Sequence, residues 1–406
     1  MTSSKRVLKP KSIDIIFVSL GLLLTTAKQL RFPGIPIGMG ELLLLAWILL
    51  SALEIIAQQK VRITKREIFQ SFFWFGYLSL LLLSIGWLFS LILNLSIDNA
   101  VYDFSALVFS GCVSIFIAIN FNAKQIVKIY CIVSLLFLAF STVFFVVAEY
   151  LPSILLPFEP WYVRHIRFTS WTSNPNQFAL FLVVTPYAYL YLIDLSNNLL
   201  KQSFLCIALV ISLGFGYLSG SDALYVSWGL GFLFAFLYKL LYFLLKVRLN
   251  KKQYLSLYLL CLLFLSFLCL AFYWQQFVLL AQIIDPAQFR QSASRINLIW
   301  NGLEAFKVSP LFGLGPGSHS GLEAALQGSE AHNSFLDWAT NTGLLGISIL
   351  LFLLKFVFQK SNNPKSIWVV TAFLALMCFI QFHYVFRQPF FWFNLILLAQ
   401  LSELKR

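Results

Sequence analysis

Histidine and arginine are the residues of this sequence whose side chains could carry out proton and phosphate chemistry. One histidine, His332, is followed directly by Asn333, and Arg290 and Arg295 precede it in the same stretch. Imidazole exchanges a proton near neutral pH, which makes histidine a natural general base for a hydroxyl group. The planar guanidinium of arginine binds phosphate through two parallel hydrogen bonds, which an ammonium group cannot do. His332 and Arg295 are therefore the first candidates for catalysis.

The acidic residues lack the pattern of a metal site. Metal-dependent enzymes that act on pyrophosphate hold the ion with a D-x-D or similar carboxylate pair, and no D-x-D occurs in this chain. Arginines would then have to neutralise such a group. The main candidates are Arg164, Arg167 and Arg295, followed by Arg290 and Arg387. We predict a site that uses neither a metal ion nor a cofactor.

Other residues could replace or support His332. Glu330 and Asp337 flank it and are reserve bases, or could orient its imidazole. His319 is a second candidate base and follows the glycine-rich stretch 310–317. Glycines in such a turn can let the backbone approach a ligand, although most such stretches are only turns.

A pair of asparagines stands at the predicted start of a helix. Asn174 and Asn176 flank Pro175, and we expect them to cap this helix by accepting hydrogen bonds from its first NH groups. This capping role is compatible with binding a sugar.

A membrane protein must position these residues. The chain has 406 residues, of which 60% are hydrophobic and only 11% are charged, whereas soluble proteins are about a quarter charged. A helix that spans a membrane needs about 20 mostly apolar residues. Apolar stretches between charged or Pro/Gly-rich breaks predict an all-α protein with twelve such helices. They lie near 13–27, 38–57, 71–93, 101–120, 125–150, 176–193, 203–219, 223–245, 253–273, 343–358, 366–383 and 389–403.

The positive residues predict which side of the membrane each connection occupies. If the N-terminus is cytoplasmic, 21 of the 29 Lys and Arg residues fall inside and 8 outside, as the positive-inside rule requires. Topology thus accounts for the net charge of +13, without nucleic-acid binding. The inner side has 16 Lys and 5 Arg, whereas the outer side has 2 Lys and 6 Arg and also the four histidines. We therefore expect the site on the outer face. The alternative is that these arginines only anchor the protein at the interface.

A long outer connection, residues 274–342, separates the helices around 253–273 and 343–358. From Arg295 to Phe306 its apolar residues recur at helical spacing, which predicts an amphipathic helix lying on the membrane. We divide the chain into helices 1–5 (1–150), a loop with helices 6–9 (151–273), the long catalytic loop (274–342) and helices 10–12 (343–406).

Several segments resemble the O-antigen ligase and O-antigen polymerase superfamily. His332-Asn333, followed after nine residues by Gly343-Leu-Leu-Gly346, is similar to its H-N-x9-G-x-x-G signature. The same holds for the preceding Arg295…Trp300…Pro310–Gly317 stretch, the Asn174-Pro175-Asn176 helix entry and the Arg387–Trp392 end. The resemblance covers roughly residues 160–400.

This resemblance implies a GT-C-like glycosyltransferase with both termini in the cytoplasm of a bacterium. Such an enzyme moves a glycan from undecaprenyl pyrophosphate to a sugar hydroxyl at the periplasmic face of the inner membrane. The expected partners are this lipid-linked donor, a glycan or lipid-linked acceptor and membrane lipid, without nucleic acid. His332 and Arg295 would be catalytic. Substrate would contact Arg164, Arg167, Arg290, Asn174, Asn176, His319, Asn333 and Arg387.

The sequence departs from the family pattern after the seventh predicted helix. Where many members carry a cation, this chain has Ser219-Gly-Ser221-Asp222, which puts a phosphate-binding role of this segment in doubt. The departure slightly favours a polymerase over a ligase that attaches the glycan to a lipid A core. A multi-pass transporter is the alternative from another class. It is disfavoured because charged residues lie toward the ends of the predicted spans and the halves show no repeat.

Overall fold

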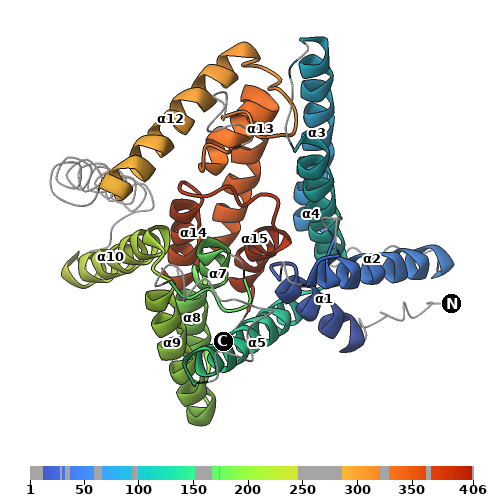
Figure 1. The fold of residues 1–406 in the computed structure, drawn as a ribbon. Helices are drawn as coiled ribbons and strands as arrows, with labels where there is room; N and C mark the ends of the chain where they lie inside the picture. Colours follow the sequence, from blue (N-terminus) through green and yellow to red (C-terminus); the bar gives the residue numbers. More distant parts are fainter. Residues whose placement is uncertain are drawn as a thin grey trace.

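The computed structural model describes most of the chain and is helical there (Figure 1). The described residues are 12–27, 30–32, 37–58, 66–93, 95, 99–150, 167–172, 174–245, 286–320, 329–362 and 367–404. Within them, loops join the helices, and an isolated antiparallel bridge pairs Arg31 with Gly38. The prediction of an all-α protein is confirmed.

The helices follow the predicted spans closely. In chain order they are α1 (Ser12–Leu24), α2 (Met39–Gln58), α3 (Arg66–Ile92), α4 (Ala100–Asn120), α5 (Ala123–Tyr150), α7 (Pro175–Leu182), α8 (Thr185–Leu195), α9 (Leu199–Leu218), α10 (Asp222–Leu245), α12 (Pro286–Val308), α13 (Ser334–Ser361), α14 (Ile367–Phe379) and α15 (Pro389–Leu401). Eight stretches of the described residues are long and apolar enough to cross a membrane, with α7 and α8 counted as one, and α1, α14 and α15 are shorter apolar helices. The span predicted at 253–273 lies outside the described residues.

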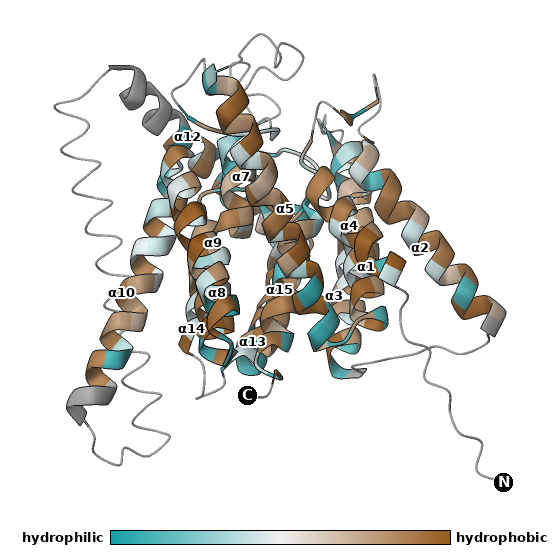
Figure 2. Ribbon diagram, turned by 90° about the horizontal axis from the view of Figure 1, so that it is seen from below, coloured by the Kyte–Doolittle hydropathy of each residue, from teal (hydrophilic) through white to brown (hydrophobic). Residues whose placement is uncertain are grey.

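Apolar side chains cover the outside of these helices as well as the core. Figure 2 shows hydrophobic residues along most of the helices. On α2, for example, Leu50, Leu53 and Ile56 are more than 60% exposed. Water would not solvate such faces, whereas lipid tails would. The chain is a polytopic membrane protein.

Helix α15 forms the centre of the bundle. Every residue from Pro389 to Leu401 is buried, and α15 packs against α13, α4, α5 and α14. Figure 1 shows it surrounded by these helices. A helix that is apolar on all sides is expected inside a bundle. The loop that precedes α15 is therefore held at the middle of one end of the protein.

Helix α13 begins earlier than the sequence predicted. The predicted span began at residue 343, but the helix starts at Ser334, capped by Asn333, whose side chain accepts from the NH groups of Phe335 and Leu336 at 3.0 Å each. Gly343 (φ 66°, ψ −168°) interrupts the helix instead of beginning it. The first turns carry polar residues that are buried against protein, so an apolar window finds only the later part.

The glycine-rich turn before α13 makes close backbone contacts. The NH of Gly315 donates to the carbonyl oxygen of Asn341 at 3.0 Å. A Cβ atom on Gly313 would lie 2.4 Å from the backbone of Asn341, and one on Gly315 would lie 2.3 Å from the nitrogen of Trp87. These glycines thus let the turn pack between the interrupted α13 and α3. That they also let the backbone approach a ligand stays a prediction.

Helix α12 confirms the predicted amphipathic segment and extends it. Its inner face packs on α13 and buries Leu298 and Ala305. Ile299, Trp300 and Leu303 are 40%, 60% and 37% exposed. An exposed apolar face of this kind suits a membrane surface, and the position of α12 on the membrane stays a prediction.

Candidate active site

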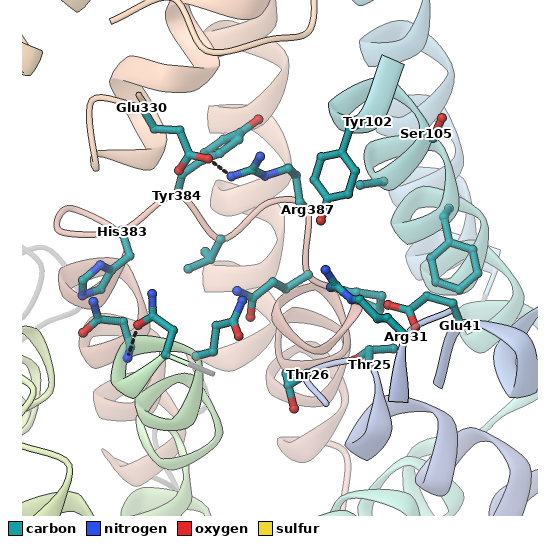
Figure 3. Close-up of a pocket in the computed structure, with 18 of the residues that line it drawn as sticks. Thr25, Thr26, Arg31, Glu41, Tyr102, Ser105, Glu330, His383, Tyr384 and Arg387 are labelled. Carbon is teal, nitrogen blue, oxygen red and sulfur yellow. Dashed lines mark hydrogen bonds and ion pairs between the residues drawn. The ribbon is translucent and has the colours of Figure 1, made fainter. Parts of the chain in front are cut away.

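A cavity of about 580 Å³ opens at one end of the bundle (Figure 3). Its described lining comes from the α1–α2 connection, the first turns of α2 and α4, the start of α7, the segment before α13 and the α14–α15 loop. Each of these segments was predicted on the outer side, and none of the described lining comes from a predicted inner connection. The fold therefore gathers the predicted outer helix ends around one space.

His332 lines this cavity in an uncommon backbone conformation. Its φ angle is +55°, which few residues other than glycine adopt. The carboxylate of Asp337 accepts hydrogen bonds from the NH groups on both sides of it, Ala331 at 2.8 Å and Asn333 at 3.2 Å. Asp337 is thus engaged by backbone NH groups on either side of the histidine. It holds the turn that presents His332 and does not contact the imidazole.

Polar contacts join this turn to the loop that carries His383. Ser334, the first residue of α13, donates to the carbonyl oxygen of His383 at 2.5 Å and accepts from the NH of Val385 at 3.2 Å. The side chain of Asn333, beyond its capping bonds, donates to Gln381 at 3.3 Å. The two histidines therefore lie on segments that are fixed to each other. The observed role of Asn333 is capping.

His383 is a residue that the sequence analysis did not select. It lines the cavity and is 8% exposed, and its Nε2 atom has no hydrogen-bond partner. Burial, with the nearby charges of Arg295, His332 and Arg167, lowers its pKa to about 3. His383 is therefore neutral at physiological pH and has a free ring nitrogen for a ligand. Its only signal in the sequence was its place at an outer helix end.

The positive charges of two predicted arginines lower the pKa values of these histidines. Partial burial, and then the positive charge of Arg295, lower the pKa of His332. Arg167 also acts on His383, and burial lowers the pKa of Arg167 while Asp222 opposes this shift. Arginines and histidines from distant parts of the sequence are thus close enough for their charges to interact, and their role in binding pyrophosphate stays a prediction.

Arg167 also accounts for the departure from the family pattern. Its Nε atom donates to the carbonyl oxygen of Ser219 at 3.1 Å, and its side chain covers Gly220, where an added Cβ would lie 3.1 Å from Arg167 Cγ. A cation is therefore present at the segment where the sequence has Asp222. The local sequence lacks the cation of the family pattern, but Arg167 brings one to the surroundings of this segment.

Arg387 is already paired with two carboxylates. It contacts Asp103 at 2.5 Å and forms an ion pair with Glu330, and its guanidinium lies 4.9 Å from the ring of Tyr384. Asp103 is fully buried on α4. Glu330 is thus engaged and is not a free reserve base. Arg387 lines the cavity, but its charge is neutralised by protein groups.

The remaining predicted residues divide into three groups. Asn174 caps α7 as predicted, accepting from the NH of Asn176 at 2.8 Å, whereas the side chain of Asn176 accepts from the hydroxyl of Ser221 at 3.2 Å instead of capping; both residues line the cavity. His319 is buried with Nε2 at 2.9 Å from the carbonyl oxygen of Gly315, and it is not among the described lining residues. Arg290 belongs to α12, with its side chain outside the described part, and Arg164 also lies outside the described residues.

Buried polar atoms without partners mark the cavity as a binding site. They belong to four lining residues and are Arg31 Nε, Gln177 Oε1, His383 Nε2 and Gln388 Oε1. Buried polar groups in proteins are almost always hydrogen-bonded, so a polar ligand would satisfy them. The sequence offered no signal for Arg31, Gln177 or Gln388, because such atoms are recognised only from their surroundings.

Within the described residues, no group of three or more His, Cys, Asp or Glu side chains is placed to hold a metal ion. Metal independence stays a prediction.

Residues 207–351 match a family model described as O-antigen ligase. The match covers about a third of the chain, from α9 into α13, and contains both Arg295 and His332. A search of curated proteins found no match.

Proposed function

We propose that this chain, which belongs to the O-antigen ligase and polymerase superfamily, is a membrane glycosyltransferase with an undecaprenyl-pyrophosphate-linked donor. The observation that carries the proposal is that His332 and His383 line one cavity, with Arg295 and Arg167 close enough for their positive charges to act on His383. Positive charge with neutral imidazoles suits the transfer of a sugar away from a pyrophosphate leaving group.

In the proposed reaction, an acceptor hydroxyl oxygen attacks the anomeric carbon of the donor sugar. The bond from this carbon to the phosphate oxygen breaks, and undecaprenyl pyrophosphate leaves with the electron pair. His332 takes the proton of the hydroxyl group, and its lowered pKa keeps it neutral for this step. Arg295 and Arg167 stabilise the charge that develops on the leaving group. His383 donates or accepts one hydrogen bond with the bound substrate.

We place this site at the periplasmic face of the inner membrane, with both termini in the cytoplasm. The support is the distribution of Lys and Arg, together with a cavity built from predicted outer segments. Reporters fused at Arg62, Lys201 and Lys360 should report the cytoplasm, and one near Glu323 the periplasm. A cytoplasmic signal near Glu323 would contradict this orientation.

We propose polymerisation of glycan repeat units as the reaction, with attachment of a finished glycan to a lipid A core as the second candidate. The local Asp222 departure is the basis for preferring a polymerase, and the family match of residues 207–351 is compatible with both candidates. The surface polysaccharide of a deletion strain separates them. A core capped by a single repeat indicates a polymerase, whereas a core without any glycan indicates a ligase.

The experiment that tests glycosyl transfer uses the purified protein in lipid vesicles. Undecaprenyl-pyrophosphate-linked glycan, labelled in its sugar, is supplied with an acceptor saccharide. A labelled product joined to the acceptor supports the proposal. Label that only crosses the membrane, still bound to its carrier, would instead support the transporter alternative.

A further inference from the structure

The proposed reaction leaves one half of the cavity without a role. This half, which we call the α1–α2 side, consists of Thr25, Thr26, Arg31, Glu41, Tyr102 and Ser105. Figure 3 shows Arg31 and Glu41 next to each other and Arg387 between this side and His383. The two halves are thus parts of one space, separated by an arginine that protein carboxylates neutralise.

The α1–α2 side has little net charge. Arg31 lies close enough to Glu41 for their charges to interact, and Glu41 also accepts from the NH of Gly38 at 3.0 Å. The Glu41 carboxylate would repel a pyrophosphate, and the one arginine of this side is already opposite a carboxylate. This half is therefore unsuited to the leaving group, in contrast to the half with Arg167 and Arg295.

Three hydroxyl groups of the α1–α2 side, those of Thr25, Thr26 and Ser105, have already used their protons. Thr25 donates to the carbonyl oxygen of Leu22 at 2.9 Å, and Thr26 to that of Leu23 at 3.2 Å. Ser105 likewise donates to its own helix, at 2.7 Å. A hydroxyl whose proton is used can only accept a further hydrogen bond. A ligand that bonds to these three hydroxyl groups must therefore supply donors, which sugar hydroxyls have and ionised phosphates lack.

The rest of this side also fits a saccharide. Tyr102 and Phe109 contribute aromatic rings to its wall, and pockets for small ligands combine such apolar walls with a few placed polar groups. Arg31 Nε is buried without a partner and would donate to a ring or hydroxyl oxygen of the ligand. A sugar has both polar hydroxyl groups and apolar faces. This side matches it with a carboxylate, hydroxyl acceptors, one free donor and aromatic walls.

We infer that the α1–α2 side binds the acceptor saccharide, with Glu41 and Arg31 as its principal ligands. This inference rests on the proposed function. The acceptor hydroxyl is presented past Arg387 toward His332, while the donor pyrophosphate occupies the half with Arg167 and Arg295. The two substrates thus meet in the middle of the cavity.

The test measures steady-state transfer by the full-length protein in vesicles. The donor is the undecaprenyl-pyrophosphate-linked repeat unit, and the soluble acceptor probes are the repeat unit released by mild acid and a lipid A core oligosaccharide. With whichever probe the wild type uses, Glu41→Gln and Arg31→Gln should each raise the acceptor KM by about 10-fold or more, because each loses a charged hydrogen-bond group. The donor KM should stay unchanged.

Glu54→Gln is the matched control, since it makes the same change on α2 away from the cavity, and it should leave both KM values unchanged. If Glu41→Gln fails to fold in a thermal unfolding assay, Arg31→Gln and Tyr102→Leu still test the inference. An unchanged acceptor KM, or a raised donor KM, in folded variants overturns it. A wild-type protein that transfers no sugar to either probe contradicts the proposed function instead.

Discussion

The two halves of the cavity differ in their charge. The half lined by His332 and His383 is under the positive charge of Arg295, which acts on both histidines, and of Arg167, which acts on His383. The α1–α2 side presents Glu41 and hydroxyl groups whose protons are used. Both halves contain arginine, so residue composition alone does not distinguish them. What distinguishes them is charge, because Arg31 lies opposite Glu41 whereas Arg295 and Arg167 add positive charge near the histidines, and on this basis we place pyrophosphate in one half and sugar in the other.

The largest effect is expected for His332, which would serve the reaction between the two halves. His332→Ala should lower turnover by about 100 to 10,000-fold, the usual contribution of a general base. Binding of undecaprenyl pyrophosphate should persist, because a neutral imidazole contributes little to holding the anion. Transfer is measured with excess chelator present, in which the wild type should keep full activity.

Near-normal turnover of His332→Ala would place the base elsewhere, and Glu330→Gln and His319→Gln would then be measured. Loss of wild-type activity in chelator, restored by a divalent cation, would contradict the metal-independent mechanism.

The next largest effect concerns Arg295 and the donor half. Arg295→Lys should lower the transfer rate by about 100-fold and weaken donor binding, because lysine keeps the charge but loses the bidentate guanidinium. Lys307→Ala, also on α12, is the control, since Lys307 is exposed and pairs with Glu304 of the same helix at 2.6 Å. Wild-type kinetics of Arg295→Lys would make this arginine an interface anchor.

A smaller effect, on stability, is expected from changing Asp103, the partner of the Arg387 that separates the two halves. Asp103→Asn removes the buried charge that faces Arg387 and should lower the stability of the protein on the order of 2 kcal/mol, as for other hydrogen bonds to charged groups. Thermal unfolding in detergent measures this change. Because Glu330 still pairs with Arg387, the donor KM should stay close to the wild-type value. A large increase in the donor KM with unchanged stability would show that Arg387 binds the donor directly.

The smallest effect is a shift in pH dependence. The pKa of His332 is lowered from 6.5, so kcat/KM should fall only as the pH drops through a midpoint below 6.5, where His332 becomes protonated. His383, with a pKa of about 3, stays neutral over this range. Arg295→Gln removes the nearby positive charge, so the pKa of His332 rises and the midpoint of its residual activity moves to higher pH. An unshifted midpoint would mean that another group titrates.

The sequence by itself determined the helices, their capping and the residue types of the site. Apolar runs located the helices because solvation by lipid depends on local composition. The cap at Asn174 was predictable for a similar reason, since a cap bonds within its own first turn. The distribution of Arg and His along the chain likewise pointed to the outer helix ends that line the cavity.

The tertiary structure decided which of these residues work together. Arg387 pairs with Asp103, and Arg167 brings a cation to Ser219, so both arginines join segments that are far apart in the sequence. The unpartnered Nε2 of His383 and the used hydroxyl proton of Ser105 on the α1–α2 side are likewise known only from the folded structure. The early start of α13 and the packing of the glycine turn depend on contacts of the same kind. Charge pairing, burial and missing hydrogen-bond partners are properties of a group's surroundings in space, and these exist only after the chain has folded.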